Sequence, residues 1–109
     1  IFGPVVMFGL GGIFVEVLKD VSFRVAPFGI DQAHEMICEI KAFPMLLGVR
    51  GQAAADIDSL AAALSNLSNF AAAHSSQILS FEANPFLVRP KGEGAVALDA
   101  VLTTQARKD

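Results

Sequence analysis

The first quarter of the chain carries apolar residues without a helical period, a pattern that predicts strands. Residues 4–8 form a β-branched apolar run, which is typical of a buried strand, and the glycine-rich residues 9–12 interrupt it. Residues 13–18 predict a second strand, and residues 21–26 predict a third in which apolar and polar side chains alternate. We therefore expect three sequential antiparallel strands before the first helix.

Two later segments show the spacing of amphipathic helices. The first begins with Asp31 as its N-cap and stops before Pro44, and the second runs from Asp56 to His74 with Ser, Asn and Asp opposite its apolar stripe. Residues 43–51 between them predict a loop. The apolar anchors are Ala33, Met36, Ile37 and Ile40 in the first helix, Met45, Leu46 and Leu47 in the loop, and Ile57, Leu60, Leu64, Leu67 and Phe70 in the second helix.

Residues 80–99 predict a β-hairpin with the turn RPKGEG at 89–94, because proline fixes φ there and glycine permits positive φ. If the hairpin is symmetric about residues 91 and 92, Asn84 lies opposite Asp99, with Cβ atoms roughly 4.5–5.5 Å apart. Glu82 points to the same face as Asn84. An amide oxygen and a carboxylate suit a shared Mg²⁺ ion. A β-bulge would separate the pair and leave ordinary polar edge positions, so both interpretations stay open.

The order of elements predicts an α+β fold: one mostly antiparallel sheet with two helices packed on one face and a polar, ligand-ready face on the other. At 109 residues the chain forms a single lobe over residues 1–102, followed by a frayed tail or linker at 103–109. Because it opens on Ile1 and an apolar run, we expect it to be a piece of a longer protein.

Composition excludes several classes. The net charge of −3 comes from mixed signs, without the clustered basic stripe of a nucleic-acid-binding protein. The apolar start contains Pro4, four glycines and Glu16, which argues against a membrane span or a signal peptide. The single cysteine, Cys38, excludes an internal disulfide and favours a small, at least half-buried thiol in a cytoplasmic protein.

Three further positions carry open alternatives. Glycines 9, 11 and 12 either let backbone amides approach a phosphate or simply make a tight turn between strands. Glu16, inside an apolar strand, needs either a partner, for which Arg24 would lie opposite, or a ligand-binding or catalytic role. His34 lies off the apolar helix stripe, which favours a solvated or capping side chain.

Three motifs occur in a recognisable order: GPVVMFGLGGIFVEVLKD at 3–20, FEANPFLV at 81–88 and VALDA at 96–100. Together they resemble the C-terminal lobe of the ATP-grasp domain of NDP-forming acyl-CoA synthetases. The related succinyl-CoA ligase β subunit has the same GG-x-x-x-E and E-x-N-P patterns. The resemblance implies that Asn84 and Asp99 coordinate the Mg²⁺ of bound ATP or ADP and that Glu82 is the acid beside them. It also implies that Gly11, Gly12 and Glu16 line the same cleft.

The implied activity is phosphoryl transfer between nucleotide and a histidine, then to an acyl phosphate that CoA captures. The N-terminal lobe, the phosphorylated histidine and the CoA-binding domains or subunits would lie elsewhere, so we expect the fragment alone to be inactive. The alternatives are a regulatory region of a protein acetyltransferase and a non-catalytic subunit-contact lobe. We also expect some self-association, because two helices cannot cover Phe2, Phe8 and Phe14 together.

Overall fold

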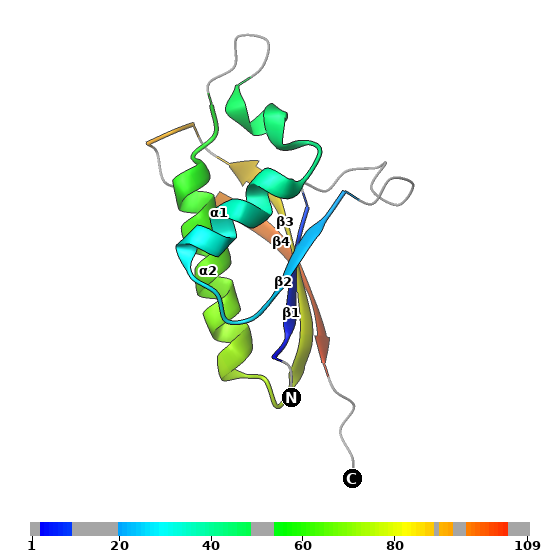
Figure 1. Ribbon diagram of the computed structural model, residues 1–109. Helices are drawn as coiled ribbons and strands as arrows, with labels where there is room; N and C mark the ends of the chain where they lie inside the picture. Colours follow the sequence, from blue (N-terminus) through cyan, green and yellow to red (C-terminus); the bar gives the residue numbers. More distant parts are fainter. Residues whose placement is uncertain (1–2, 10–19, 49–53, 89, 93–95, 105–109) are drawn as a thin grey trace.

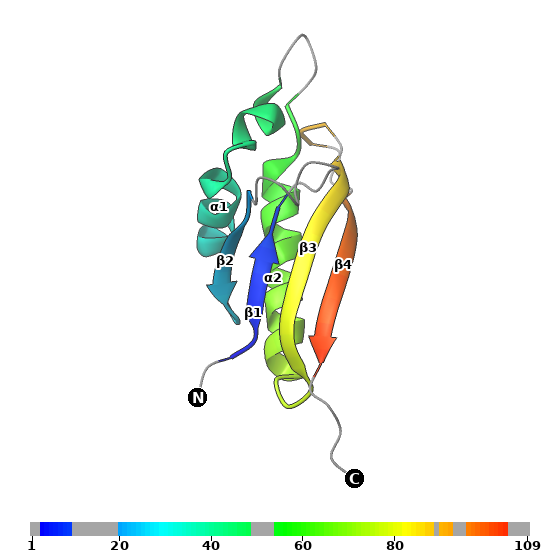
Figure 2. The same ribbon diagram turned by 90° about the vertical axis from the view of Figure 1, so that its right-hand side faces the viewer.

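The computed structural model describes residues 3–9, 20–48, 54–88, 90–92 and 96–104, which form two layers (Figure 1). One layer is a sheet with the strand order β2-β1-β3-β4. The strands are β1 (Val5–Phe8), β2 (Ser22–Val25), β3 (Ile78–Val88) and β4 (Val96–Thr104). The other layer consists of α1 (Ile30–Glu39) and α2 (Ile57–Ala73), which lie on the same side of the sheet (Figure 2). The expected α+β architecture is confirmed.

The sheet is mixed rather than purely antiparallel. β1 pairs with β2, and β3 with β4, in the antiparallel sense, whereas β1 and β3 are parallel. Both helices lie in the connection from β1 to β3. Because this connection is long, it brings the chain back to the end of the sheet where β1 begins, so β3 can run parallel to β1. The strand expected at residues 13–18 lies outside the described residues. Among the described strands, β1 lies between β2 and β3.

The helices follow the sequence prediction with two corrections. α2 begins as expected, with the Asp56 side chain as N-cap accepting the backbone N–H of Ser59 at 3.0 Å. The N-cap of α1 is Gly29, whose position offers no side-chain cap, and Asp31 lies inside the first turn. A carboxylate there still interacts favourably with the helix dipole. The expected loop contains a short 3₁₀ helix, η1 (Phe43–Leu47), with Pro44 in its first turn.

The core lies between the sheet and the helices. It joins alternate residues of the strands to the apolar stripes of α1 and α2. Three predicted anchors are wrong: Met45, Leu47 and Phe70 are 65 %, 54 % and 47 % exposed. In η1, Leu46 is buried in the core and the partly buried Phe43 packs against it. Phe70 instead stacks against the His74 ring, with centroids 4.4 Å apart. The fully buried large side chains are Val6, Phe8, Met36, Ile37, Leu60 and Leu64.

Two serines on α2 contradict the expected polar outer face. Ser65 and Ser68 are buried, and both contact the backbone of Phe28 in the segment that joins β2 to α1. Ser65 Oγ donates to the Phe28 carbonyl at 2.9 Å, and Ser68 Oγ accepts the Phe28 N–H at 3.1 Å. A chain segment that crosses a helix without regular structure needs such partners for its buried peptide groups. These serines therefore hold the segment against α2.

The described helices are too short or too polar to cross a membrane. Of the three phenylalanines that suggested self-association, Phe8 is completely buried. Phe2 and Phe14 lie outside the described residues.

Candidate functional site

The β3–β4 hairpin pairs Asn84 with Asp99, as the sequence predicts. The ladder does contain an irregularity, between Pro85 and Leu87, where the register shifts by one residue. This shift lies between the pair and the turn, so it does not separate Asn84 from Asp99. Opposed positions in an antiparallel ladder have Cβ atoms roughly 4.5–5.5 Å apart. Asn84 and Asp99 therefore occupy directly opposed register positions on adjacent strands.

Glu82 lies on the sheet face opposite the helices. Its neighbours along β3, Phe81 and Ala83, are buried against the helices, whereas Glu82 is half-buried. Since side chains alternate along a strand, Glu82 faces the uncovered side. Its register partner on β1 is Met7, which also pairs with Phe23 of β2. This face is thus polar at β3 but apolar at β1 and β2, and the expectation of a wholly polar face is wrong.

The described part of β1 ends beside these residues. Gly9 N donates to the carbonyl oxygen of Ala83 at 3.2 Å, which continues the β1–β3 ladder up to the start of the glycine-rich segment. Gly9, the last described residue before the gap, therefore lies beside Ala83, between Glu82 and Asn84 in the sequence of β3. Gly11, Gly12 and Glu16 themselves lie outside the described residues, so their part in the predicted cleft remains a prediction.

The turn end of the hairpin is held by α2. Asp56 Oδ2 accepts the backbone N–H of Gly92 at 3.2 Å, and Lys91 N donates to the Ala54 carbonyl at 2.9 Å. A β-bridge joins Ala55 to Pro90. The sequence located Asp56 at the start of the second helix but did not indicate this contact, because helical periodicity carries no information about a partner 36 residues away.

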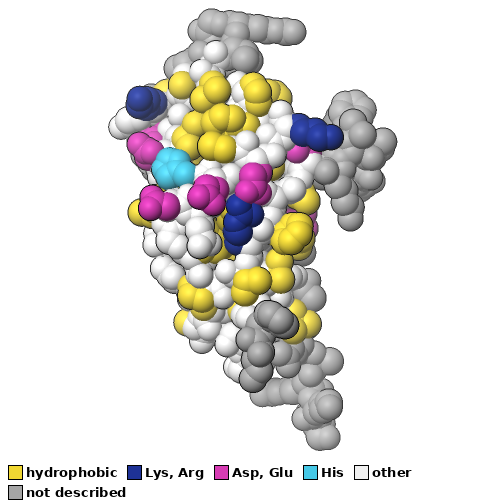
Figure 3. All heavy atoms as spheres, viewed as in Figure 1, with side chains coloured by type: hydrophobic (Ala, Val, Ile, Leu, Met, Phe, Trp, Pro, Cys, Tyr) yellow, Lys and Arg dark blue, Asp and Glu magenta, His cyan; other side chains and the backbone are white. Residues whose placement is uncertain are grey.

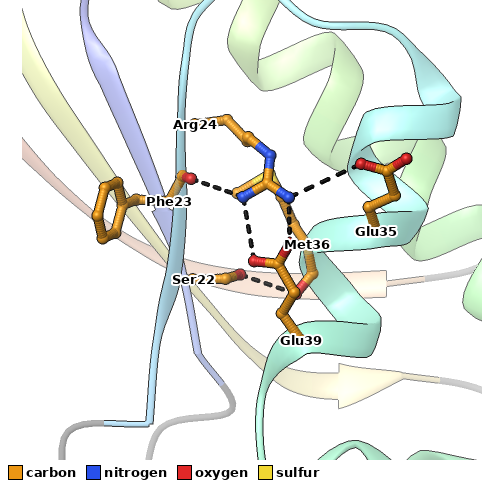
Figure 4. Close-up of polar contacts among 6 residues, drawn as sticks. All are labelled: Ser22, Phe23, Arg24, Glu35, Met36 and Glu39. Carbon is orange, nitrogen blue, oxygen red and sulfur yellow. Dashed lines mark hydrogen bonds and ion pairs between the residues drawn. The ribbon is translucent and has the colours of Figure 1, made fainter.

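Arg24 belongs to a charged cluster between β2 and α1 (Figure 4). Its Nη1 donates to Glu39 Oε1 at 3.0 Å, its Nη2 contacts Glu39 Oε2, and Glu35 Oε2 lies 3.8 Å from Nη2. The hydrogen bond from Arg24 lowers the pKa of the Glu39 carboxyl, and the same bond raises the pKa of Arg24. The cluster joins a strand to a helix and is structural. Glu16, the partner that the sequence suggested for Arg24, lies outside the described residues.

The histidines and the cysteine form no metal centre. His34 Nε2 lies 3.2 Å from Asp58 Oδ1, and His74 Nδ1 lies 2.9 Å from the Phe70 carbonyl oxygen. Cys38 is exposed, contrary to the expectation of a buried or half-buried thiol. Among the described residues, no three or more His, Cys, Asp or Glu side chains gather in a way that would hold a metal. Whether Asn84 and Asp99 hold a metal ion therefore remains a prediction.

The chain is similar to known proteins over most of its length. A family described as "ATP-grasp domain" matches residues 1–104. The chain is 48 % identical over 99 residues to the acetate–CoA ligase [ADP-forming] II subunit beta of Pyrococcus furiosus, covering 91 % of this chain and 42 % of that subunit. It is 45 % identical over 98 residues to the 4-hydroxybutyrate–CoA ligase [ADP-forming] of Nitrosopumilus maritimus, covering 90 % of this chain and 14 % of that enzyme. The chain thus spans less than half the length of these relatives.

Two solved structures have the same fold. A protein of Pyrococcus horikoshii Ot3 superimposes with a TM-score of 0.79 at 44 % identity, covering 93 % of this chain and 42 % of its own. A dinucleotide-forming acetyl-coenzyme A synthetase 1 of Ca. Korarchaeum cryptofilum superimposes with a TM-score of 0.76 at 39 % identity, covering 95 % and 47 %. That structure holds coenzyme A and Mg-AMPPCP, with a phosphohistidine segment pointing towards the nucleotide binding site.

Proposed function

The chain belongs to the ATP-grasp domain family, and from this premise we propose that it is the nucleotide- and Mg²⁺-binding lobe of a cytoplasmic, NDP-forming acyl-CoA synthetase. Relatives that match nearly all of this chain are named as ADP-forming ligases of acetate or 4-hydroxybutyrate. The similar Korarchaeum enzyme was solved with coenzyme A and a magnesium nucleotide analogue. These findings support an acid–thiol ligase as the parent activity.

The observation that carries the proposal is the register pairing of Asn84 with Asp99. Mg²⁺ prefers oxygen donors, takes one or two protein carboxylates or amides, and leaves its other positions to phosphate oxygens and water. An amide and a carboxylate on adjacent strands fit that donor set. When bound, the ion would neutralise charge that develops on the transferred phosphoryl group.

Other groups on the uncovered sheet face have complementary roles in the proposal. Glu82, on the same face, would place a second carboxylate beside the pair and help to orient the group that exchanges phosphate with the nucleotide. Met7 and the 63 % exposed Phe23 offer an apolar strip suited to the flat base of a nucleotide. Gly11 and Gly12 would let the backbone approach phosphate, and Glu16 would line the cleft.

The rest of the reaction needs parts that this lobe does not supply. We propose that a phosphorylated histidine, the N-terminal ATP-grasp lobe and the CoA-binding domains belong to other regions or subunits of the parent enzyme. Phosphate would pass from nucleotide to histidine and then to the carboxylic acid, and CoA would displace it from the acyl phosphate. The lobe alone would bind magnesium nucleotide without turnover.

Mn²⁺ binding tests the metal pair directly. Titration of the isolated chain with Mn²⁺ and ATP, followed by electron paramagnetic resonance, should show bound Mn²⁺ that Asn84→Ala and Asp99→Ala remove. In the parent enzyme the same substitutions should lower acyl-CoA-dependent nucleotide turnover by more than about 100-fold, since even outer-shell partners of metal ligands cost 10–100-fold.

Asn69→Ala and Asp58→Asn are matched controls, because both side chains are exposed on α2. They should leave Mn²⁺ binding and turnover unchanged. Turnover whose metal dependence survives Asp99→Ala would contradict the metal site. A parent without nucleotide turnover would favour the regulatory or subunit-contact alternatives instead.

A further inference from the structure

A pocket lies where α1, η1, the start of α2 and the hairpin turn meet. Its volume is about 340 Å³, within the range of pockets that hold ligands or partner side chains. Phe43, Leu47 and Ile57 are the largest apolar residues of its lining. His34, Asp58 and Lys91 contribute polar groups. β3 continues four residues beyond Asn84, roughly 13 Å of strand, and Lys91 lies in the turn that follows, so the pocket is separate from the proposed metal pair. We call it the η1 pocket.

The helix η1 exposes two large apolar side chains, of which Leu47 lines the η1 pocket. Met45 and Leu47 are 65 % and 54 % exposed, although the residue between them, Leu46, is buried and anchors η1. Figure 3 shows hydrophobic side chains gathered at this end of the molecule above a belt of charged ones. Exposed apolar groups around a concave site are typical of protein-binding surfaces, and methionine adapts well to different partners. We therefore expect a binding partner to cover this surface.

The polar groups of the pocket do not suit a small polar ligand. A small-molecule site needs convergent donors and acceptors aimed at the ligand. Here the carboxylate of Asp56 is directed to the backbone N–H groups of Ser59 and Gly92. His34 is already paired with Asp58. What the pocket offers is chiefly apolar contact, which an aliphatic or aromatic side chain can fill.

The charges around the η1 pocket indicate which type of residue a partner would carry next to the apolar side chain that fills the pocket. Asp58 stands beside the pocket with 85 % of its side chain exposed, and Glu35, at 67 %, lies on the outer surface of α1. Among the described lining residues, Asp56 is buried and accepts backbone N–H groups, so Asp58 is the exposed carboxylate that a partner can reach, while Lys91 is the basic group of the lining. A second copy of the chain would bring the same carboxylates and a net charge of −3, which disfavours self-docking. A basic partner is complementary.

We propose that the η1 pocket docks a segment of another protein, in which a bulky apolar side chain enters the pocket and an adjacent Lys or Arg pairs with Asp58. The apolar side chain supplies the binding energy because it is desolvated on all sides, as at the centre of other interfaces. The basic residue sets orientation and partner choice. This docking is independent of nucleotide binding at the hairpin pair.

A phage-displayed library of random 12-residue peptides, panned on the full chain, tests the proposal. The expected consensus is a Leu, Met or Phe followed within two positions by Lys or Arg. A synthetic consensus peptide, measured by fluorescence anisotropy, should bind Leu47→Asp and Met45→Asp at least about tenfold more weakly. Asp58→Asn should weaken binding about threefold to tenfold and lower its salt dependence.

Two control variants match these changes. Leu79→Asp alters a leucine that is 49 % exposed on β3, and Asn69→Lys makes the same net charge change as Asp58→Asn. Both should bind the peptide as the unaltered chain does, and circular dichroism should show that all variants are folded. Mn²⁺ binding should be unchanged in Leu47→Asp, which separates this proposal from the metal site.

Three results would overturn the proposal. One is the absence of an enriched consensus, or a consensus without a basic residue. Another is a consensus peptide that binds Leu47→Asp and Met45→Asp as tightly as the unaltered chain. The third is a dimer in sedimentation that Leu47→Asp converts to monomer, because a second copy would then be the occupant.

Discussion

Asp56 accepts a hydrogen bond from the backbone N–H of Gly92 across 3.2 Å, although 36 residues separate the two in sequence. The other carboxylate oxygen of Asp56 accepts the N–H of Ser59 at 3.0 Å and caps α2. Gly92 adopts a φ of +90°, a conformation that favours glycine. One buried carboxylate thus joins the start of a helix to the turn of the hairpin that carries Asn84 and Asp99.

Asp56→Ala should therefore lower the free energy of unfolding by about 2–4 kcal/mol, since it removes a helix cap and leaves the Gly92 N–H without this acceptor. Asp56→Ser should cost less, because a serine hydroxyl can still cap the helix while the bond to Gly92 is lost. Urea denaturation measures both. Asp58→Ala, at the exposed neighbouring position, should cost under about 1 kcal/mol. Equal losses for Asp56→Ala and Asp56→Ser would show that the bond to Gly92 carries the whole effect.

Ser68→Ala should destabilise the fold by about 1–3 kcal/mol. The Ser68 hydroxyl is fully buried, accepts the Phe28 N–H at 3.1 Å and lies 2.7 Å from the Ser65 carbonyl oxygen. Alanine would leave a buried N–H without its acceptor, which costs the desolvation of that group. Thermal and urea unfolding would measure the loss.

Ser65→Ala provides the comparison within the same network. Ser65 donates to the Phe28 carbonyl oxygen, but Ser68 lies 3.2 Å from that oxygen and can donate in its place. The expected loss is therefore smaller, about 0.5–1.5 kcal/mol. Ser75→Ala, at an exposed position just after α2, should have no measurable effect. A Ser65→Ala variant less stable than Ser68→Ala would contradict this assignment.

The Arg24–Glu39 pair should make stability depend on pH in acid. The hydrogen bond from Arg24 lowers the pKa of Glu39 in the folded state, so the charged carboxylate is favoured by folding. Stabilisation from a carboxyl with a lowered pKa is present above its unfolded pKa, about 4.3 for glutamate, and is lost as pH falls through the folded value. The difference in denaturation midpoint between the unaltered chain and Glu39→Gln should be constant near neutral pH and shrink below about pH 4.

Two further measurements, at high salt and on a Glu35 variant, test the Arg24–Glu39 pair. Both side chains are partly exposed, so 1 M salt should reduce the difference at neutral pH. Glu35→Gln should have a weaker effect, because its carboxylate lies 3.8 Å from the guanidinium without a hydrogen bond between them. A difference for Glu39→Gln that does not change between about pH 3 and pH 7 would contradict a stabilising role for the charged pair.

Local patterns predicted much of the candidate site. The alternation of residues and the turn chemistry at 89–94 placed Asn84 opposite Asp99, and the structure pairs them so. The hairpin is not symmetric as the prediction assumed, but its register shift occurs nearer the turn, so Asn84 still pairs with Asp99. The cleft residues Gly11, Gly12 and Glu16 lie outside the described residues, and the chemistry of the whole set remains a prediction.

The sequence by itself determined the elements whose signals are local. The apolar spacing located both helices, Asp56 marked the start of α2, and the proline and glycines of the hairpin turn set the pairing of its strands. Each of these depends on contacts between residues close in the chain or joined by a short turn. Periodicity and capping are readable in one dimension for that reason.

Only the tertiary structure decided which distant segments meet. In the folded chain, β1 runs parallel to β3 and Arg24 pairs with Glu39. Ser65 and Ser68 are buried against the segment that joins β2 to α1. A hydroxyl or a guanidinium has the same local pattern whether it faces water or a distant peptide group. Its partner is chosen by the packing of the whole sheet and helix layer, because every buried polar group must find a hydrogen bond there.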